Sequence, residues 1–191
     1  MYDRAAMKTG ERECTMQAME FLRLLYLYLP AFFGNAAPVV ARITPGIKRW
    51  VMPIHAPLFG NHKTVRGFVA GIVIAVATSM VQYLLSPVWP ALSHPLHASL
   101  QSAFVTGLLL GTGALGGDLL KSLLKRRVGI APGKPWTPWD GIDYILGAIV
   151  LLSPLYVPTF WGAVFLIVLS PMASFLSNII AFHLRLKETW H

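Results

Sequence analysis

Acidic side chains are scarce in this chain. Asp and Glu total 8 in 191 residues, against 16 Lys and Arg. Beyond residue 20 the only acids are Asp118, Asp140, Asp143 and Glu188. All charged residues together make up 13% of the chain, whereas a soluble domain carries about 25%. So few charges cannot cover the surface of a soluble globule, and the composition therefore indicates a membrane protein.

Several other sequence features are also missing. The single cysteine, Cys14, excludes an internal disulfide framework and fits no metal-binding spacing. There is no G-x-x-x-x-G-K-[ST] loop, which excludes a P-loop protein. Residues 1–20 carry charges of both signs, and Arg23 interrupts the apolar run that follows, so a cleavable signal peptide is not favoured. A signal cleaved near residues 35–37 is the minority alternative.

Apolar residues are abundant, at 55% of the chain, and they gather in long stretches. A spanning helix needs about 20 mostly apolar residues. Five stretches approach or reach this length, over residues 21–40, 67–86, 99–119, 142–157 and 159–182. We therefore expect an all-α integral membrane protein with about five transmembrane helices, forming a single membrane domain over residues 1–191. Its first 20 residues are expected to form a polar extension.

Positive charge is concentrated in two segments between the expected spans. Residues 41–66 and residues 120–141 contain five Lys or Arg each, whereas the connections 87–98 and 154–158 contain none. Cytoplasmic loops carry the positive excess of membrane proteins. Both basic segments are therefore expected at the cytoplasmic face of the cell (inner) membrane, with the N-terminus outside. This distribution also argues against a nucleic-acid partner, which the net charge of +8 alone would allow.

The third expected span contains two pairs of glycines at helical spacing. Gly107 and Gly111 are four residues apart, as are Gly113 and Gly117. Small residues at this spacing let helix backbones approach closely inside a bilayer. We interpret these glycines as packing positions, with a polar substrate passage as the minority alternative.

An acid, Asp118, follows these glycines directly. An ionisable residue at membrane depth is costly and is by default a functional candidate. At about 100° per residue, Ser122 and Lys125 share the helix face of Asp118. Arg126 lies at the edge of that face, and Arg127 points away from it. The structural alternative is charge pairing along the helix, together with anchoring of the basic residues at the membrane surface.

Two further acids, Asp140 and Asp143, lie at the start of the fourth expected span. Asp140 as the N-cap and Asp143 near the positive end of the helix dipole would have structural roles. Two carboxylates three residues apart on one face repel, however, unless a cation lies between them. Lys125, Arg126 or a divalent metal can supply that cation. Mg²⁺ typically takes one or two carboxylates and leaves its other positions to water and substrate phosphates.

The acids and bases together therefore predict a site for a metal-bound polyphosphate, in which acids hold the metal and bases hold the phosphates. Lys63, Thr64 and Arg66, just before the second span, offer further phosphate donors. The alternative for these three residues is anchoring at the membrane interface. Asn35 is a polar residue in an apolar run, where a hydrogen bond to a neighbouring helix is favoured over substrate contact.

Three blocks of the sequence resemble the CDP-archaeol synthase family, which belongs to the membrane CTP:lipid-phosphate cytidylyltransferases. The blocks are LPAFFGNAAPVV, FGNHKTVRGF and GDLLKSLLKRRVGIAPGKPWTPWDGIDYILG. The third is the most specific, because it resembles G-D-x-x-x-S-x-x-K-R-R, then P-G, then D-x-x-D. The resemblance extends over nearly the whole chain from about Pro30.

This resemblance implies an all-helical membrane enzyme that uses CTP and Mg²⁺. Such an enzyme converts an isoprenoid ether glycerol phosphate to its CDP-activated form and releases pyrophosphate. The catalytic residues that it implies are Asp118, Lys125, Asp140 and Asp143, with the three aspartates also binding the metal. The residues implied to bind the nucleotide or lipid phosphate are Asn35, Lys63, Thr64, Arg66, Ser122 and Arg126.

Two other classes of protein agree less well with these residues. A non-catalytic membrane transporter of an ion or small solute would explain the glycines and the buried acid. It does not explain why acids and bases gather at one face. A CDP-alcohol phosphotransferase would carry a D-G-x-x-A-R pattern, but Asp140 and Gly141 are not followed by Ala-Arg.

Overall fold

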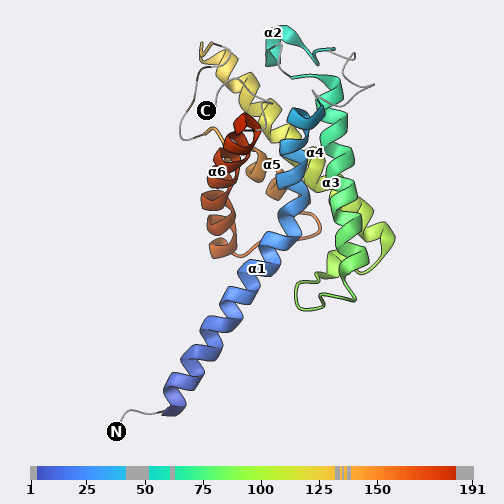
Figure 1. Ribbon diagram of the computed structural model, residues 1–191. Helices are drawn as coiled ribbons and strands as arrows, with labels where there is room; N and C mark the ends of the chain where they lie inside the picture. The colour runs from blue at the N-terminus through green and yellow to red at the C-terminus, as the bar shows by residue number, and fades with distance from the viewer. Residues whose placement is uncertain are drawn as a thin grey trace.

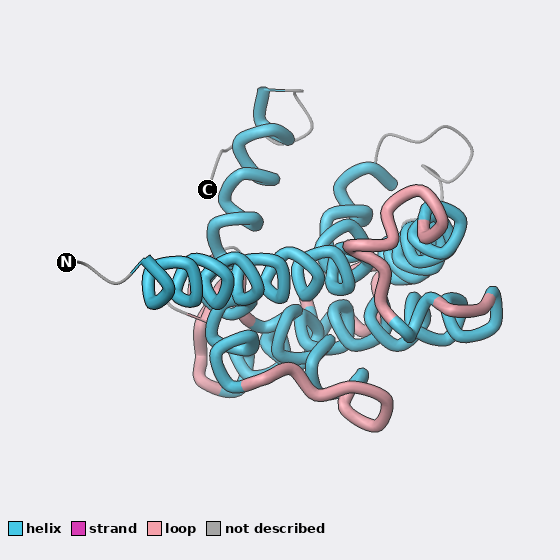
Figure 2. The backbone as a smooth tube through the Cα atoms, turned by 90° about the horizontal axis from the view of Figure 1, so that it is seen from below, coloured by secondary structure: helices cyan, strands magenta, loops and turns pink. Residues whose placement is uncertain are grey.

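The computed structural model describes residues 4–41, 52–60, 63–131, 134, 136 and 139–183. The helices are α1 (Arg4–Ala41), α2 (Ala56–Phe59), α3 (Val65–Leu85), the 3₁₀ turn η1 (Pro95–His97), α4 (Leu100–Arg127), α5 (Asp143–Leu152) and α6 (Phe160–His183). Figures 1 and 2 show that loops connect these helices and that the described residues contain no strand. The expectation of an all-helical fold is confirmed.

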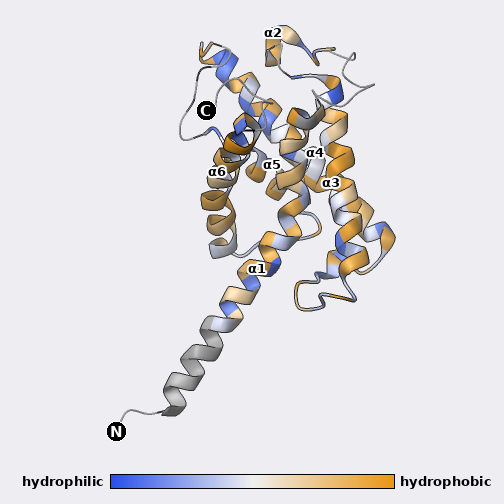
Figure 3. Ribbon diagram, in the orientation of Figure 1, coloured by the Kyte–Doolittle hydropathy of each residue, from blue (hydrophilic) through white to orange (hydrophobic). Residues whose placement is uncertain are grey.

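Three of these helices, α3, α4 and α6, are long and apolar enough to cross a membrane by length and composition. Many of their large apolar side chains are exposed, including Val73 on α3 and Phe175 on α6. Figure 3 shows hydrophobic colours over much of α3 and α6, whereas hydrophilic colours gather near the end of α4. Exposed apolar helix faces of this kind suit contact with lipid chains.

Two of the expected spans differ from the helices in the structure. The stretch at 21–40 is the second half of α1, a helix of 38 residues that begins at Arg4, so the expected polar extension continues the same helix. The stretch at 142–157 contains the 10-residue helix α5, which ends at Leu152. At about 1.5 Å per residue, α5 is roughly 15 Å long and reaches only about halfway across a hydrocarbon core.

The helices pack so that their connections fall at two opposite ends (Figure 1). The end of α1, the start of α3 and the end of α4 lie at one end of the bundle. The connection 86–99 and the turn after α5 lie at the other end, from which the N-terminal half of α1 projects. The described cations that precede α3 and those that end α4 therefore share one end, as expected. Arg42, Lys48 and Arg49 of the first basic segment lie outside the described residues.

Glycines let α5 approach α4 closely beside the polar end. A Cβ atom added at Gly113 would lie 2.6 Å from the carbonyl oxygen of Gly147, and one added at Gly117 would overlap the carbonyl oxygen of Asp143. Gly111 faces α3 instead, where an added Cβ atom would lie 2.6 Å from the Cβ atom of Ala75. The packing role expected for these glycines is confirmed. The contact at Gly117 places the first residue of α5 beside Asp118.

This contact predicts opposite effects for two neighbouring glycines. Gly117→Ala forces α5 away from α4, and overpacking of this kind typically costs about 1–3 kcal/mol. Nothing lies within 4 Å of an added Cβ atom at Gly116. Gly116→Ala should therefore leave stability unchanged or raise it by up to about 1 kcal/mol, because Ala favours the helix over Gly. Melting temperatures in detergent measure both effects, and equal values for the two variants would contradict the packing.

Candidate active site

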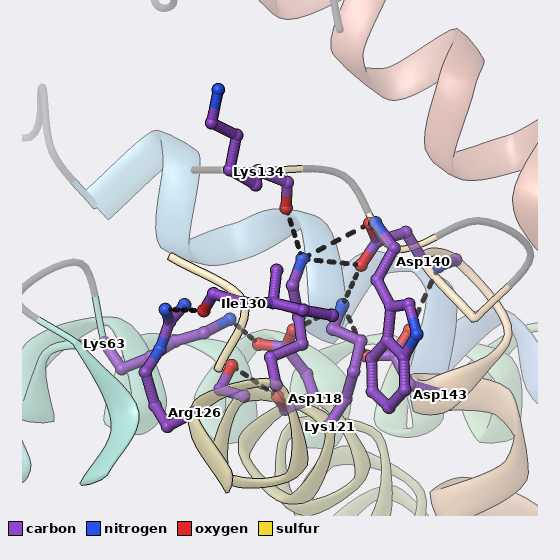
Figure 4. A network of polar contacts seen from close by, with 12 residues as sticks. Lys63, Asp118, Lys121, Arg126, Ile130, Lys134, Asp140 and Asp143 are labelled. Carbon is purple, nitrogen blue, oxygen red and sulfur yellow. Dashed lines mark hydrogen bonds and ion pairs between the residues drawn. The ribbon is translucent and has the colours of Figure 1, made fainter. Parts of the chain in front are cut away.

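A cluster of carboxylates and ammonium groups lies where α4, the start of α5 and the residues before α3 meet (Figure 4). The Nζ atom of Lys121 is at its centre. It lies 3.3 Å from Oδ1 of Asp118, 3.4 Å from Oδ1 of Asp140 and 3.0 Å from Oδ2 of Asp143. One ammonium group therefore bridges three acids that come from α4, from the loop after α4 and from α5.

Two further lysines complete this cluster. Lys63 forms an ion pair with Oδ2 of Asp118. The Nζ atom of Lys125 lies 3.4 Å from both carboxylate oxygens of Asp140 and donates to the carbonyl oxygen of Lys134 at 2.6 Å. The three aspartates and the three lysines balance in formal charge. This balance matters because a buried charge is costly unless it is paired.

The members of this cluster differ in how far water reaches them. The side chain of Asp143 is 8% exposed and that of Lys121 is 16% exposed, whereas that of Asp140 is 34% exposed. Asp140 is therefore the acid nearest to the open side of the cluster. Lys63, whose side chain is 28% exposed, is the most exposed of the three lysines, so an incoming charged ligand meets Asp140 and Lys63 first.

The loop before α5 holds Asp140 in place. The carboxylate of Asp140 accepts a hydrogen bond from the backbone N–H of Trp136. Gly141 follows with φ of 105°, a left-handed conformation that favours glycine, and its N–H donates to Oδ1 of Asp143 at 3.1 Å. The N-cap of α5 is Ile142, so the alternative expectation that Asp140 caps the helix is wrong. Asp143 is in the first turn of α5, where the helix dipole favours an acid.

The surroundings of Asp140 keep it ionised. Burial alone would raise the pKa of its carboxyl group. The hydrogen bond from Trp136 and the positive charges of Lys121 and Lys125 act in the opposite direction and lower the pKa overall. Asp140 therefore carries a negative charge at neutral pH.

The structure brings together five of the expected site residues: Lys63, Asp118, Lys125, Asp140 and Asp143. Ser122 lies against them, because its hydroxyl donates to the backbone carbonyl of Asp118 at 2.9 Å. Arg127 is exposed, in keeping with its expected direction away from the site.

Two of the other expected phosphate-binding residues, Thr64 and Arg126, have structural contacts of their own. The Thr64 hydroxyl caps α3 by accepting from the backbone N–H of Gly67 at 3.3 Å. The Arg126 guanidinium donates to the carbonyl oxygen of Ile130, which ties the end of α4 to the loop that follows. Arg66 lies in the first turn of α3. Asn35 is half-buried in α1, next to the point where this helix packs against α3.

The central residue of the cluster, Lys121, was not among the expected site residues. The cation expected between Asp140 and Asp143 was Lys125, Arg126 or a metal, and the structure places Lys121 there instead. Its signal in the sequence is the spacing of three residues from Asp118, at which helical side chains are neighbours. The expected helix face contained Ser122 and Lys125, with Arg126 at its edge, and Lys121 was not assigned to it.

The donor atoms of the cluster suit a hard divalent cation, although their present spacing suits an ammonium group. Among the residues that the structure describes, no three His, Cys, Asp or Glu side chains form a ready-made metal site. The three carboxylates lie 3.0–3.4 Å from Nζ of Lys121, whereas Mg²⁺ binds oxygen at about 2.0–2.1 Å. They are nevertheless the oxygen ligands that Mg²⁺ prefers.

Acids and bases of balanced charge form a partly buried cluster at one end of an apolar helical bundle. These features define an integral membrane protein with a polar site for a charged substrate. The family model of the CarS-like CDP-archaeol synthases matches residues 16–191. This chain belongs to the CDP-archaeol synthase family.

Individual relatives agree with this assignment. A CDP-archaeol synthase of Pyrococcus furiosus is 30% identical over 170 residues, covering 87% of this chain and 96% of the relative. One of Methanoculleus marisnigri is 34% identical over 164 residues, covering 83% and 92%. A solved structure of an intramembrane enzyme for archaeal membrane lipids biosynthesis superposes with a TM-score of 0.65 at 28% identity, covering 81% of this chain and 92% of that one.

Proposed function

We propose that this protein is a CTP:lipid-phosphate cytidylyltransferase that converts a membrane glycerol-phosphate lipid to its CDP-activated form and releases pyrophosphate. The observation that carries the proposal is the cluster around Lys121, where three carboxylates and three ammonium groups gather at one end of a membrane bundle. The CDP-archaeol synthases that resemble this chain support the choice of substrate class. Membership of this enzyme family does not support the alternative of a non-catalytic transporter.

The depth of the cluster suits a lipid headgroup. Asp118 lies 18 residues after the start of α4 at Leu100, which is about 27 Å along the helix axis. The hydrocarbon core is about 30 Å thick, so this acid lies near one edge of the core. The lipid chains would remain beside the apolar faces of α3 and α6, while the phosphate reached the polar cluster from the side of the bilayer.

The reaction joins the two substrates through one displacement. An oxygen of the lipid phosphate attacks the α-phosphorus of CTP, the bond to the β-phosphate oxygen breaks, and pyrophosphate leaves. No protein nucleophile or general base is needed, because the attacking phosphate is already ionised and such transfers depend on positioning and charge neutralisation. Lys63, Lys121 and Lys125 would pair with the phosphate oxygens of the two substrates. Mg²⁺ held by the three aspartates would stabilise the charge that develops on the attacking and leaving oxygens.

The reaction is tested by incubating purified protein with CTP labelled in its α-phosphate, Mg²⁺ and a panel of ether- and ester-linked glycerol phosphates. We expect the label to enter lipid and an equal amount of pyrophosphate to form, with EDTA abolishing both. Asp118→Asn, Asp140→Asn and Asp143→Asn should each lower turnover by about 100-fold or more, because each near-isosteric change removes a charge from the transition-state site.

Arg127→Gln is the matched control, because this exposed side chain lies at the same end of α4 but points away from the cluster. It should keep turnover within about threefold of the wild type, since surface changes away from the site cost little. Melting temperatures should show that all four variants remain folded. Wild-type turnover in all three Asn variants would exclude the site, and transfer to none of the lipid phosphates would exclude the reaction.

We place the cluster at the cytoplasmic face of the cell membrane, where CTP is available. The support is the concentration of Lys and Arg before α3 and at the end of α4, against none in the connection 87–98. In a Cys14→Ser background, Lys134→Cys and Ala98→Cys place single thiols at exposed positions of the two ends. A membrane-impermeant thiol reagent should label only the Ala98→Cys variant in intact cells and both variants after permeabilisation. Labelling of only Lys134→Cys in intact cells would reverse the orientation.

A further inference from the structure

We infer that Lys121 is a built-in counter-ion that holds the metal position of the nucleotide-free site, so that a divalent cation binds well only together with a polyphosphate. This inference rests on the proposed metal-dependent function and adds to it a positioning residue. Lys121 would act indirectly. It would hold the three carboxylates around its ammonium group, and it would make metal binding depend on a bound polyphosphate.

The contacts single out this lysine from the other two in the cluster. Lys63 pairs with Asp118, and Lys125 pairs with Asp140. In the described part of the chain, only Lys121 lies within ion-pair distance of all three acids, at 3.0–3.4 Å. Figure 4 shows its side chain entering between the acids from α4. Its ammonium group therefore lies at the point on which the three carboxylates converge.

The balance of charges explains why a metal ion without a polyphosphate competes poorly with the Lys121 ammonium for the position among the three carboxylates. A metal ion that enters between the carboxylates has to displace the ammonium of Lys121. The displaced charge then loses three acidic partners inside a site where the side chain is only 16% exposed. A charge in such surroundings is costly unless it finds a new partner.

A bound polyphosphate removes this cost. Its oxygens give the displaced ammonium a new anionic partner, while the metal takes the carboxylates. Lysine suits this exchange, because its flexible four-carbon stem lets the ammonium move while its backbone remains in α4. Lys125 is less free to exchange, since its Nζ atom also donates to the carbonyl oxygen of Lys134 at 2.6 Å.

The test measures metal binding in the full-length, detergent-solubilised protein without any lipid substrate. Mn²⁺ replaces Mg²⁺, and electron paramagnetic resonance reports the free ion at increasing protein concentration, with and without CTP. The wild type should bind Mn²⁺ at least about tenfold more tightly with CTP than without it. Lys121→Met should bind Mn²⁺ alone at least about tenfold more tightly than the wild type does, because a positive charge within about 4 Å no longer opposes the ion. This variant should gain little more from CTP.

Two controls separate this role from a general effect of charge. Lys121→Arg keeps the positive charge and should bind Mn²⁺ alone as weakly as the wild type. Lys134→Met makes the same chemical change at an exposed side chain that points away from the carboxylates (Figure 4), and it should also behave as the wild type. If Lys121→Met does not yield folded protein, Lys121→Gln is measured in its place.

The outcomes distinguish the inference from the function on which it rests. Mn²⁺ binding by Lys121→Met or Lys121→Gln no tighter than by the wild type would overturn the role of Lys121 while leaving the metal site in place. Equal tightening in Lys134→Met would overturn it as well, because the effect would then come from net charge. A wild type that binds no Mn²⁺ even with CTP would overturn the metal site itself and the inference with it. If Lys121 only stabilised the fold, its substitution would weaken Mn²⁺ binding. If its ammonium group occupies the metal position, its substitution makes Mn²⁺ bind more tightly.

Discussion

The ammonium group of Lys121 lies among three carboxylates that would repel one another without it, and the polar end of this protein is arranged around that contact. The acids belong to α4, to the following loop and to α5. Lys63 adds a fourth segment, the residues before α3, through its pair with Asp118. Electrostatic attraction at one point therefore joins parts of the chain that are far apart in sequence. Because the site is partly buried, this attraction is less weakened by water than it would be at the surface.

Backbone packing decides whether these charges can meet. α5 starts beside Asp118 because Gly117 has no side chain to keep the Asp143 carbonyl away, and Gly113 and Gly147 continue the contact along both helices. The left-handed turn at Gly141 then lets the loop bring Asp140 to Lys121 together with Asp143. α5 is short because it ends at Leu152, after 10 residues, where the chain turns before α6.

Much of the fold follows from the sequence, because long apolar stretches and glycines at helical spacing have few structural solutions in a bilayer. The scarcity of acids also made Asp118, Asp140 and Asp143 stand out. The beginning of α1 at Arg4 could not be predicted in this way, because a polar helix beyond the bundle has no apolar face to indicate it. The end of α5 at Leu152 could not be predicted either, because the apolar stretch of the sequence continues to residue 157.

The sequence indicated most members of the cluster, but it did not indicate the residue at the centre of the cluster. The sequence places Asp118 and Lys125 on one face of a helix. This placement could be predicted, because it depends only on the spacing of the two residues within a single helix. The central position of Lys121 depends on where the loop and α5 bring Asp140 and Asp143, and these distances arise only from packing. The same reason explains why the N-cap expectation for Asp140 was wrong: its carboxylate is drawn to Trp136 and the lysines instead of to the start of α5.

The most direct test is the position of the metal ion in a crystal structure of the protein with Mn²⁺ and CTP. We predict one anomalous-scattering peak within coordination distance of Asp118, Asp140 and Asp143. We also predict that the ammonium of Lys121 has moved from the carboxylates to a phosphate oxygen. A metal bound away from these aspartates, or an ammonium group still among all three of them beside bound metal and CTP, would contradict these predictions.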